Sequence, residues 1–192
     1  VSKDRIHAGI VMNYISDKRN NPIFPSSGIY INVKLQGYAG LNTYSKSFAQ
    51  LIPEIAFYRG IGSDSRLIIA ERLGGGVTLG QTAFYQSLFL GGQGNLLGFR
   101  QNRFAGQQMF YNNLEARLRL GDVASYVIPG QFGLSAFYDA GRVWNKNDQS
   151  ETWHQGVGGG VYFAPAVLTV LQIQAGYSKE GWYPSFSLQF RF

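Results

Sequence analysis

The chain has no cysteine among its 192 residues, so neither a disulfide framework nor thiolate chemistry is available to it. Its two histidines, His7 and His154, stand alone with no ligand spacing around them, which argues against a metal site. The hydrolase motifs G-x-S-x-G and H-E-x-x-H are also missing. We therefore expect no enzyme activity, no catalytic residue, no metal and no cofactor.

Long apolar runs and clustered charges are missing as well. No stretch reaches the roughly 18 consecutive apolar residues of a membrane helix, and no basic start precedes an apolar core as in a signal peptide. We treat the chain as a mature or truncated piece. The formal net charge is +6, but the basic residues are scattered, so we expect no nucleic-acid partner.

Glycine and aromatic residues are abundant instead. The chain contains 25 Gly, 12 Tyr and 14 Phe, and only 15% of its residues are charged. Such a composition fits a β-rich protein whose strands are apolar on one face, and the length is enough for one domain. We expect that domain to span residues 1–192.

Alternating apolar and polar residues predict about nine strands, because period two is the strand signature. The expected ranges are 5–16, 29–39, 47–58, 66–73, 110–120, 131–144, 155–163, 168–178 and 184–192. Pro53 weakens the third of them, and the glycines at 74–76 are expected to end the fourth. No stretch has a convincing helical period.

The two faces of these strands suggest a membrane environment. Alternation alone fits a soluble sandwich or jelly roll equally well, with the apolar face as core. Polar faces in strands of about ten residues, with aromatic residues near the strand ends, favour a transmembrane antiparallel β-barrel with a polar lumen. We expect the apolar side chains to face outward, among them Leu114, Leu118, Leu134, Phe186, Leu188 and Phe190.

A long glycine-rich stretch, residues 88–107, interrupts the strands, and we name it the central loop. Two downstream strands place single carboxylates, Glu115 and Asp139, on their polar faces. Antiparallel neighbours bring such positions to one lumen wall, where a nearby cation relieves their repulsion. We therefore expect the loop to fold into the lumen and to place Arg100 or Arg103 near these acids, with its glycines allowing the tight reversals.

Six segments resemble, in chain order, pieces of BamA/TamA-type outer-membrane barrels, the bacterial surface antigen family: DKRNNPIFPSSG, FYQSLFLGG, GGQGNLLGFRQNRF, NLEARLRL, FYDAGRVW and FSLQFRF. The resemblance implies a sixteen-stranded barrel of which this chain is about the C-terminal half, so that the domain 1–192 is partial and the family's N-terminal periplasmic or enzymatic domains lie outside it. It implies a conserved loop, here Gly91, Gly92, Leu96, Leu97, Gly98, Phe99, Arg100 and Arg103. It also implies partner acids at Glu115 and Asp139, and a C-terminal strand signal at Phe186, Leu188, Phe190 and Phe192.

One position departs from the family pattern. The family's loop motif reads hydrophobic–Arg–Gly–aromatic, and Leu97 stands where the arginine is expected. A guanidinium suits that position because it pairs bidentately with carboxylates. If neither Arg100 nor Arg103 replaces it, the acids lack the family's partner.

The resemblance implies a protein of the bacterial outer membrane that assembles, inserts or translocates proteins without covalent chemistry. Its partners would be outer-membrane lipid, unfolded or exported client proteins, and the barrel-assembly machinery through the C-terminal strand. Because nine strands leave two open edges, another copy or segment would close the barrel. The alternatives are the anchoring or secretion barrel of an upstream patatin-like or metallophosphoesterase-like hydrolase domain, and a diffusion porin.

Overall fold

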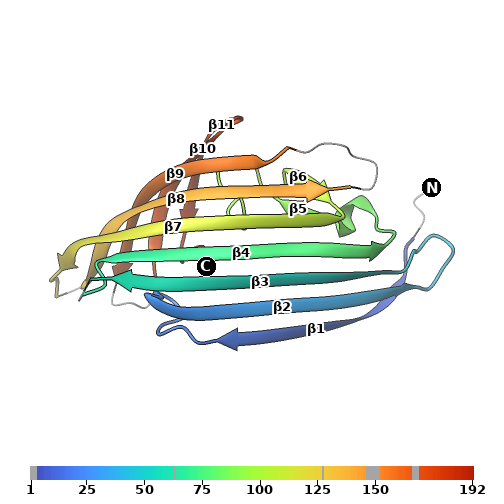
Figure 1. The fold of residues 1–192 in the computed structure, drawn as a ribbon, viewed down its shortest axis with the longest axis horizontal. Coiled ribbons are helices and arrows are strands. Elements are labelled where there is room, and N and C mark those ends of the chain that lie inside the picture. The colour runs from blue at the N-terminus through green and yellow to red at the C-terminus, as the bar shows by residue number, and fades with distance from the viewer. Residues whose placement is uncertain (1–3, 63, 127, 146–151, 166–168) are drawn as a thin grey trace.

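The computed structural model describes residues 4–62, 64–126, 128–145, 152–165 and 169–192. Nine strands form one antiparallel sheet in which each strand pairs with its neighbours along the chain, apart from a small hairpin (Figure 1). They are β1 (His7–Asp17), β2 (Ser27–Gly40), β3 (Phe48–Ile61), β4 (Leu67–Gly80), β7 (Gln108–Val123), β8 (Gly130–Trp144), β9 (His154–Pro165), β10 (Leu171–Ser178) and β11 (Gly181–Ser187). The predicted all-β meander is thus confirmed.

The central loop lies on the concave side of this curved sheet (Figure 1). It begins after a short 3-10 helix, η1 (Phe84–Gln86), and contains the hairpin of β5 (Leu88–Leu90) and β6 (Phe104–Gly106). Leu90 and Leu96 are fully buried and Phe99 nearly so, packed against Tyr111 of β7. The expectation that this loop folds into the lumen is confirmed. Among the described residues, no helix is long and apolar enough to cross a membrane.

Side-chain directions follow the predicted alternation along β7 and β8. Leu114, Leu118 and Leu134 are each more than 40% exposed on the outer face. Glu115 and Asp139 are completely buried on the inner face. Asn113 pairs directly with Asp139 across the two strands, and Glu115 lies two residues farther along, so both acids share one wall. The sheet is therefore apolar outside and polar inside.

Strand β4 continues to Gly80, so the expectation that it ends at Gly74–Gly76 is wrong. A side chain on Gly74 would overlap the ring of Tyr111, whose hydroxyl donates to Glu54 at 2.7 Å. Glu54, Gly74 and Tyr111 lie in one row across β3, β4 and β7. The glycine therefore leaves space for an aromatic ring to cross the strand, rather than ending it.

Strand β3 accommodates Pro53 within its fourteen residues. Pro53 pairs with Val33 of β2, whereas the described ladder toward β4 passes from Leu51 directly to Glu54. A proline has no N–H to donate, so its place in a strand is beside such an interruption.

The end of the chain departs from the predicted strand 184–192. Strand β11 stops at Ser187, and residues 189–192 turn into the concave side of the sheet; we call them the inner segment. Phe186 of β11 and Leu188 just beyond it are more than half exposed, but Phe190 is only 4% exposed. The outward assignment of Phe190 is therefore wrong. Contacts of the inner segment with β3, β4, β7 and β8 replace a continued ladder.

We predict that Gly74→Ala destabilises the barrel by about 1–3 kcal/mol, because the added methyl group displaces the Tyr111 ring. Gly37→Ala is the matched control, since a Cβ at this β2 glycine meets no atom within 4 Å. The measurement is the urea midpoint of heat-modifiable migration on gels. Equal midpoints for the two variants would contradict the packing role assigned to Gly74.

Candidate functional site

The inner wall carries a set of buried polar side chains that we call the lumen network. Its members come from β3, β4, β7, β8 and the inner segment: Glu54, Arg72, Asn113, Glu115, Arg117, Asp139 and Arg191. Period two places the six strand residues there, since every second residue of a strand faces the same side, whereas Arg191 reaches the wall because the chain leaves the sheet after Ser187. Charges at such depth are retained only where they are paired and hydrogen-bonded.

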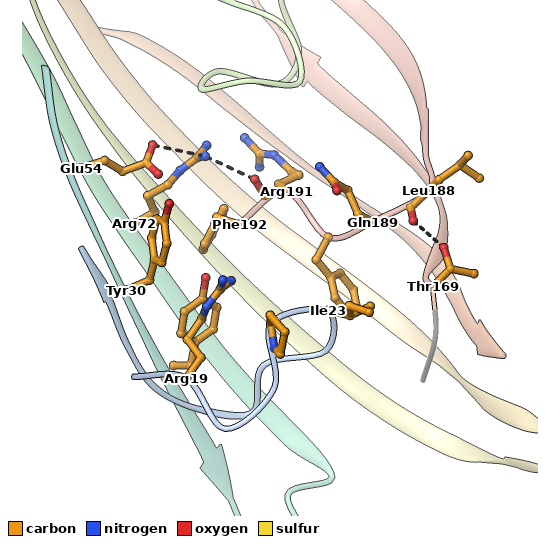
Figure 2. A pocket seen from close by; sticks show the side chains of 13 residues that line it. Arg19, Ile23, Tyr30, Glu54, Arg72, Thr169, Leu188, Gln189, Arg191 and Phe192 are labelled. Atoms are coloured by element: carbon orange, nitrogen blue, oxygen red, sulfur yellow. Dashed lines mark hydrogen bonds and ion pairs between the residues drawn. The ribbon is translucent and has the colours of Figure 1, made fainter. Parts of the chain in front are cut away.

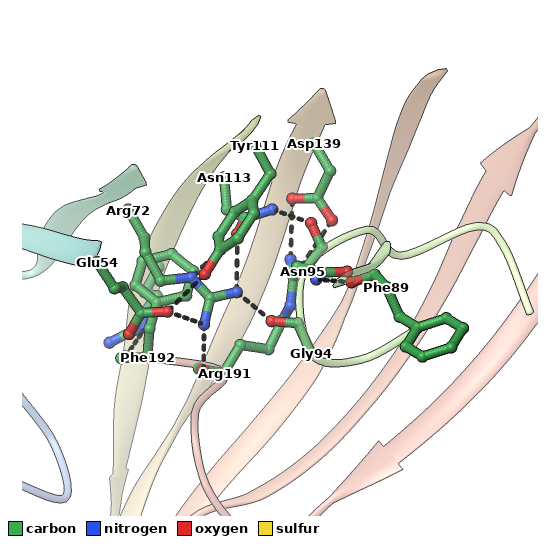
Figure 3. A network of polar contacts seen from close by, with 11 residues as sticks. Glu54, Arg72, Phe89, Gly94, Asn95, Tyr111, Asn113, Asp139, Arg191 and Phe192 are labelled. Carbon is green, nitrogen blue, oxygen red and sulfur yellow. Dashed lines mark hydrogen bonds and ion pairs between the residues drawn. The ribbon is translucent and has the colours of Figure 1, made fainter. Parts of the chain in front are cut away.

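Asp139 is the carboxylate that joins the loop to the end of the chain (Figure 3). Its Oδ2 accepts a hydrogen bond from the Leu97 backbone N–H at 2.7 Å. The guanidinium of Arg191 donates to both carboxylate oxygens, at 3.1 Å and 2.7 Å. This bidentate pair is buried, with Asp139 at 0% and the Arg191 side chain at 3% exposure. One acid thus holds two segments of chain against β8.

Arg72 on β4 forms a second junction (Figure 3). It donates to Oδ1 of Asn113 at 3.0 Å and 2.7 Å, and to the backbone oxygen of Gly94 in the loop. It also donates to the backbone oxygen of Arg191 at 3.3 Å, and its guanidinium lies 3.7 Å from the Glu54 carboxylate. Arg72 therefore contacts the same two segments as Asp139, from the neighbouring part of the wall.

Glu115 and Arg117 form the third part of the network. Arg117 Nε donates to Glu115 Oε1 at 3.0 Å, and both side chains are completely buried. Gln172 of β10 donates to the same carboxylate oxygen at 3.2 Å. Arg117 also donates to the backbone oxygen of Phe192 at 3.1 Å and lies 3.7 Å above the ring of Phe190. This pair therefore also supports the inner segment.

The loop arginines do not meet the two acids, so that expectation is wrong. Arg103 pairs with Glu180, in the turn between β10 and β11, at 2.8 Å, and Arg100 is exposed. Glu115 instead takes its cation from two residues along its own strand. Asp139 takes its cation from the inner segment. Sequence reasoning missed both cations, because Arg117 lies on the same strand as Glu115 and Arg191 falls within the predicted strand 184–192.

Leu97, which stands at the arginine position of the family motif, reaches Asp139 through its main chain. Its side chain is 3% exposed, and its N–H points at the carboxylate. The backbone here lies so close to the wall that a Cβ on Gly156 of β9 would overlap the Leu97 carbonyl. Gly98, with φ of 89°, adopts a left-handed conformation, and its carbonyl accepts a hydrogen bond from the Ser178 hydroxyl. The loop is thus seated by backbone contacts.

Two glycines of the wall leave room for the loop backbone. A Cβ on Gly156 of β9 would overlap the Leu97 carbonyl, and a Cβ on Gly176 of β10 would lie 2.7 Å from the Gly98 nitrogen. The signal that sequence reading missed is an inward-facing glycine on each of two adjacent strands, Gly156 and Gly176. Sequence reasoning also missed Arg72. Its signal is that it is the one basic residue of β4, whose other residues are mostly apolar or glycine.

Beside the inner segment lies a cavity of about 510 Å³ (Figure 2). Its polar lining includes Arg19, Glu54, Arg72 and Arg191, and Tyr30 forms part of its aromatic wall. Within the described part of the chain, no group of three or more metal-ligating side chains gathers at one point. The arrangement is a set of paired charges that fixes the positions of the central loop and the inner segment.

We predict that Asp139→Asn lowers the free energy of unfolding by about 3–5 kcal/mol, because it leaves Arg191 buried without its counter-charge. Asp122→Asn is the control: this exposed carboxylate lies 4.0 Å from Arg119, and its loss should change stability by about 0–1 kcal/mol. Urea titration followed by tryptophan fluorescence measures both. A loss at Asp139 no greater than that at Asp122 would show that the buried pair is not the main anchor.

The fold and the sequence both have counterparts among known proteins, although no curated protein matches the chain. The crystal structure of BamA from Haemophilus ducreyi lacking POTRA domains 1-3 is similar to this fold, with a TM-score of 0.72 at 17% sequence identity. The similarity covers 94% of this chain. It covers 40% of the BamA chain, so this chain spans less than half of that protein's length. The Omp85 superfamily domain matches residues 2–190. The chain therefore belongs to the Omp85 superfamily.

Proposed function

We propose that this chain forms part of a bacterial outer-membrane barrel that inserts or exports proteins, and that client strands pair at the free edge of β11. Membership of the Omp85 superfamily, whose members are outer-membrane barrels of protein assembly and translocation, supports the general role.

The outer surface supports a membrane location. Large apolar side chains on consecutive strands are exposed there, including Leu114, Leu134, Val161 and Ile173 at 41% to 58%. In water such a continuous apolar face would drive association, whereas hydrocarbon selects it. The charged residues of the lumen network lie on the opposite face.

The free edge of β11 is the observation that carries the proposal. Within the described residues, β11 pairs with β10 alone and β1 with β2 alone, so the sheet ends at these two strands. An unpaired edge presents a row of N–H and C=O groups that hydrocarbon cannot satisfy. An incoming strand satisfies them by β-augmentation, in which main-chain hydrogen bonds supply the affinity.

The filled interior disfavours the diffusion porin. A porin needs a water-filled lumen. Here Leu90, Leu96 and Phe99 of the loop pack against Tyr111, and the inner segment occupies the wall beneath them. An anchoring barrel for an upstream enzyme would also tolerate a filled lumen, but it would have no reason to bind unfolded outer-membrane proteins.

The proposed function predicts a position-dependent cross-link. A photoreactive phenylalanine analogue replaces Phe186 on β11 in the full-length protein, in cells that synthesise a tagged outer-membrane protein. The control is the same analogue at Leu134 on β8, which is also exposed on the outer face but lies between two paired strands. We expect the client to cross-link at position 186 several times more strongly than at position 134.

Equal yields at the two positions would exclude pairing at the β11 edge. A complete lack of client at both positions, with the protein folded, would favour the anchoring barrel. Small-solute permeability measured on the same protein should stay low, and a high permeability would favour the porin.

A further inference from the structure

The sequence of the inner segment fits two paths of the chain: a continuation of strand β11 and the observed turn into the lumen. The alternation of Phe186, Leu188, Phe190 and Phe192 continues the outward face of β11, as a longer strand requires. In the structure the last ladder pair is Gln172 with Ser187, and the chain then leaves the sheet. The pattern and the observed path therefore favour different positions for Phe190 and Phe192.

Contacts at three of its residues, Phe190, Arg191 and Phe192, hold the inner segment in the lumen. Arg191 makes the bidentate pair with Asp139. The ring of Phe190 packs edge-on against those of Phe24, at 5.2 Å, and Tyr162, at 5.4 Å between centroids. The Arg72 guanidinium lies 4.6 Å from the centre of the Phe192 ring. Each of the last residues except Gln189 thus has a defined site on the wall.

The same position leaves several buried polar atoms without a hydrogen bond. They include Tyr162 Oη, Glu115 Oε2, Arg117 Nη1 and Arg191 Nε, which lie on the inner segment or on wall residues near it. An unsatisfied polar atom carries its full desolvation cost, and a partly satisfied network is less stable than a complete one. Water that enters when the segment withdraws would satisfy these atoms. Their cost therefore offsets part of the binding of the inner segment.

Space for such a movement exists on two sides. The cavity of about 510 Å³ borders the inner segment beside Arg19 and Tyr58, and a second cavity of about 200 Å³ lies beside Gln93 and Gln174. Both are lined by Phe190 and Arg191. The segment can therefore change position without displacing the strands of the wall.

We propose that Arg191 is the positioning residue of a latch that couples the central loop to the path of the chain after β11. With Arg191 on Asp139, the inner segment stays in the lumen and the acid holds the Leu97 N–H. When Arg191 withdraws, residues 189–192 extend β11, and Asp139 loses its counter-charge and its hold on the loop. The longer edge serves client pairing if the proposed function holds, but the latch itself needs no client.

The test measures thiol reactivity, and the 192 residues of this chain contribute no native cysteine to the background. Single cysteines are placed at Phe192 or at Leu97 in the full-length protein, and their reaction rates with a small maleimide are measured in isolated outer membranes. Each is combined with Arg191→Gln, with Arg191→Lys, and with the control Arg119→Gln on β7, outside the lumen network. Heat-modifiable migration verifies that each variant is folded.

Arg191→Gln should raise the rate about tenfold at both positions, because a buried thiol reacts through the opened state. Arg191→Lys should give a smaller rise at both, since a lysine keeps the charge but lacks the bidentate fork. Arg119→Gln should change neither rate. The Lys variant also keeps the test decisive if the Gln variant fails to fold.

A rise at position 192 with no change at position 97 would show that the segment moves independently of the loop, and would overturn the coupling. Unchanged rates at both positions would overturn the latch altogether. These rates involve no client protein. Failure of the cross-link at position 186 therefore leaves the latch standing, and failure of the latch leaves client pairing at β11 standing.

Discussion

A carboxylate that is buried away from water needs hydrogen-bond donors and a positive counter-charge. In this sheet the positions of the segments inside depend on one such carboxylate, that of Asp139. Asp139 receives its hydrogen bonds from two segments that are distant in sequence. The loop supplies the Leu97 N–H, and the inner segment supplies the guanidinium of Arg191, which is 52 residues from Asp139. Arg72 contacts the same two segments through backbone oxygens of Gly94 and Arg191. The loop and the inner segment therefore do not pack as independent insertions. Each completes the charge balance or hydrogen bonding that the other requires.

The requirement for such pairing follows from the inverted faces of the sheet. An apolar outer surface leaves the polar face inside, so the interior has few of the large apolar side chains that stabilise a water-soluble core. The apolar contacts inside come mostly from the central loop, through Leu90, Leu96 and Phe99, and from the inner segment, through Phe190. Backbone ladders and paired charges supply the remainder. In a sheet of this kind, the segments that fold inside supply the apolar core.

Glycine makes this filling of the lumen sterically possible. At Gly74 the missing side chain lets the Tyr111 ring cross β4 and reach Glu54 on β3. At Gly156 it lets the loop backbone lie directly on β9, which brings the Leu97 N–H within hydrogen-bond distance of Asp139 on the adjacent strand β8. The position of the loop is therefore set as much by the glycines of the wall as by its own residues. Leu97 can stand at the arginine position of the family motif because the main chain, not the side chain, makes the contact.

Much of the fold was determined by local sequence. Period-two alternation specified nine strands and the outward direction of Leu114, Leu118 and Leu134, because the side-chain direction in a strand depends only on residue parity. The acids Glu115 and Asp139 could be placed on one wall by the same rule, and the glycine-rich loop could be assigned to the lumen. The cation that neutralises each acid could not be predicted. Arg103 is closer to Asp139 in sequence than Arg191 is, yet the curvature of the sheet brings Arg191 to the acid and Arg103 to Glu180. Alternation likewise continues through Phe192, whereas the strand ends at Ser187. Both outcomes depend on which residues meet across the concave space, and only the tertiary structure decides that, because a pattern along the chain carries no information about distances across the lumen.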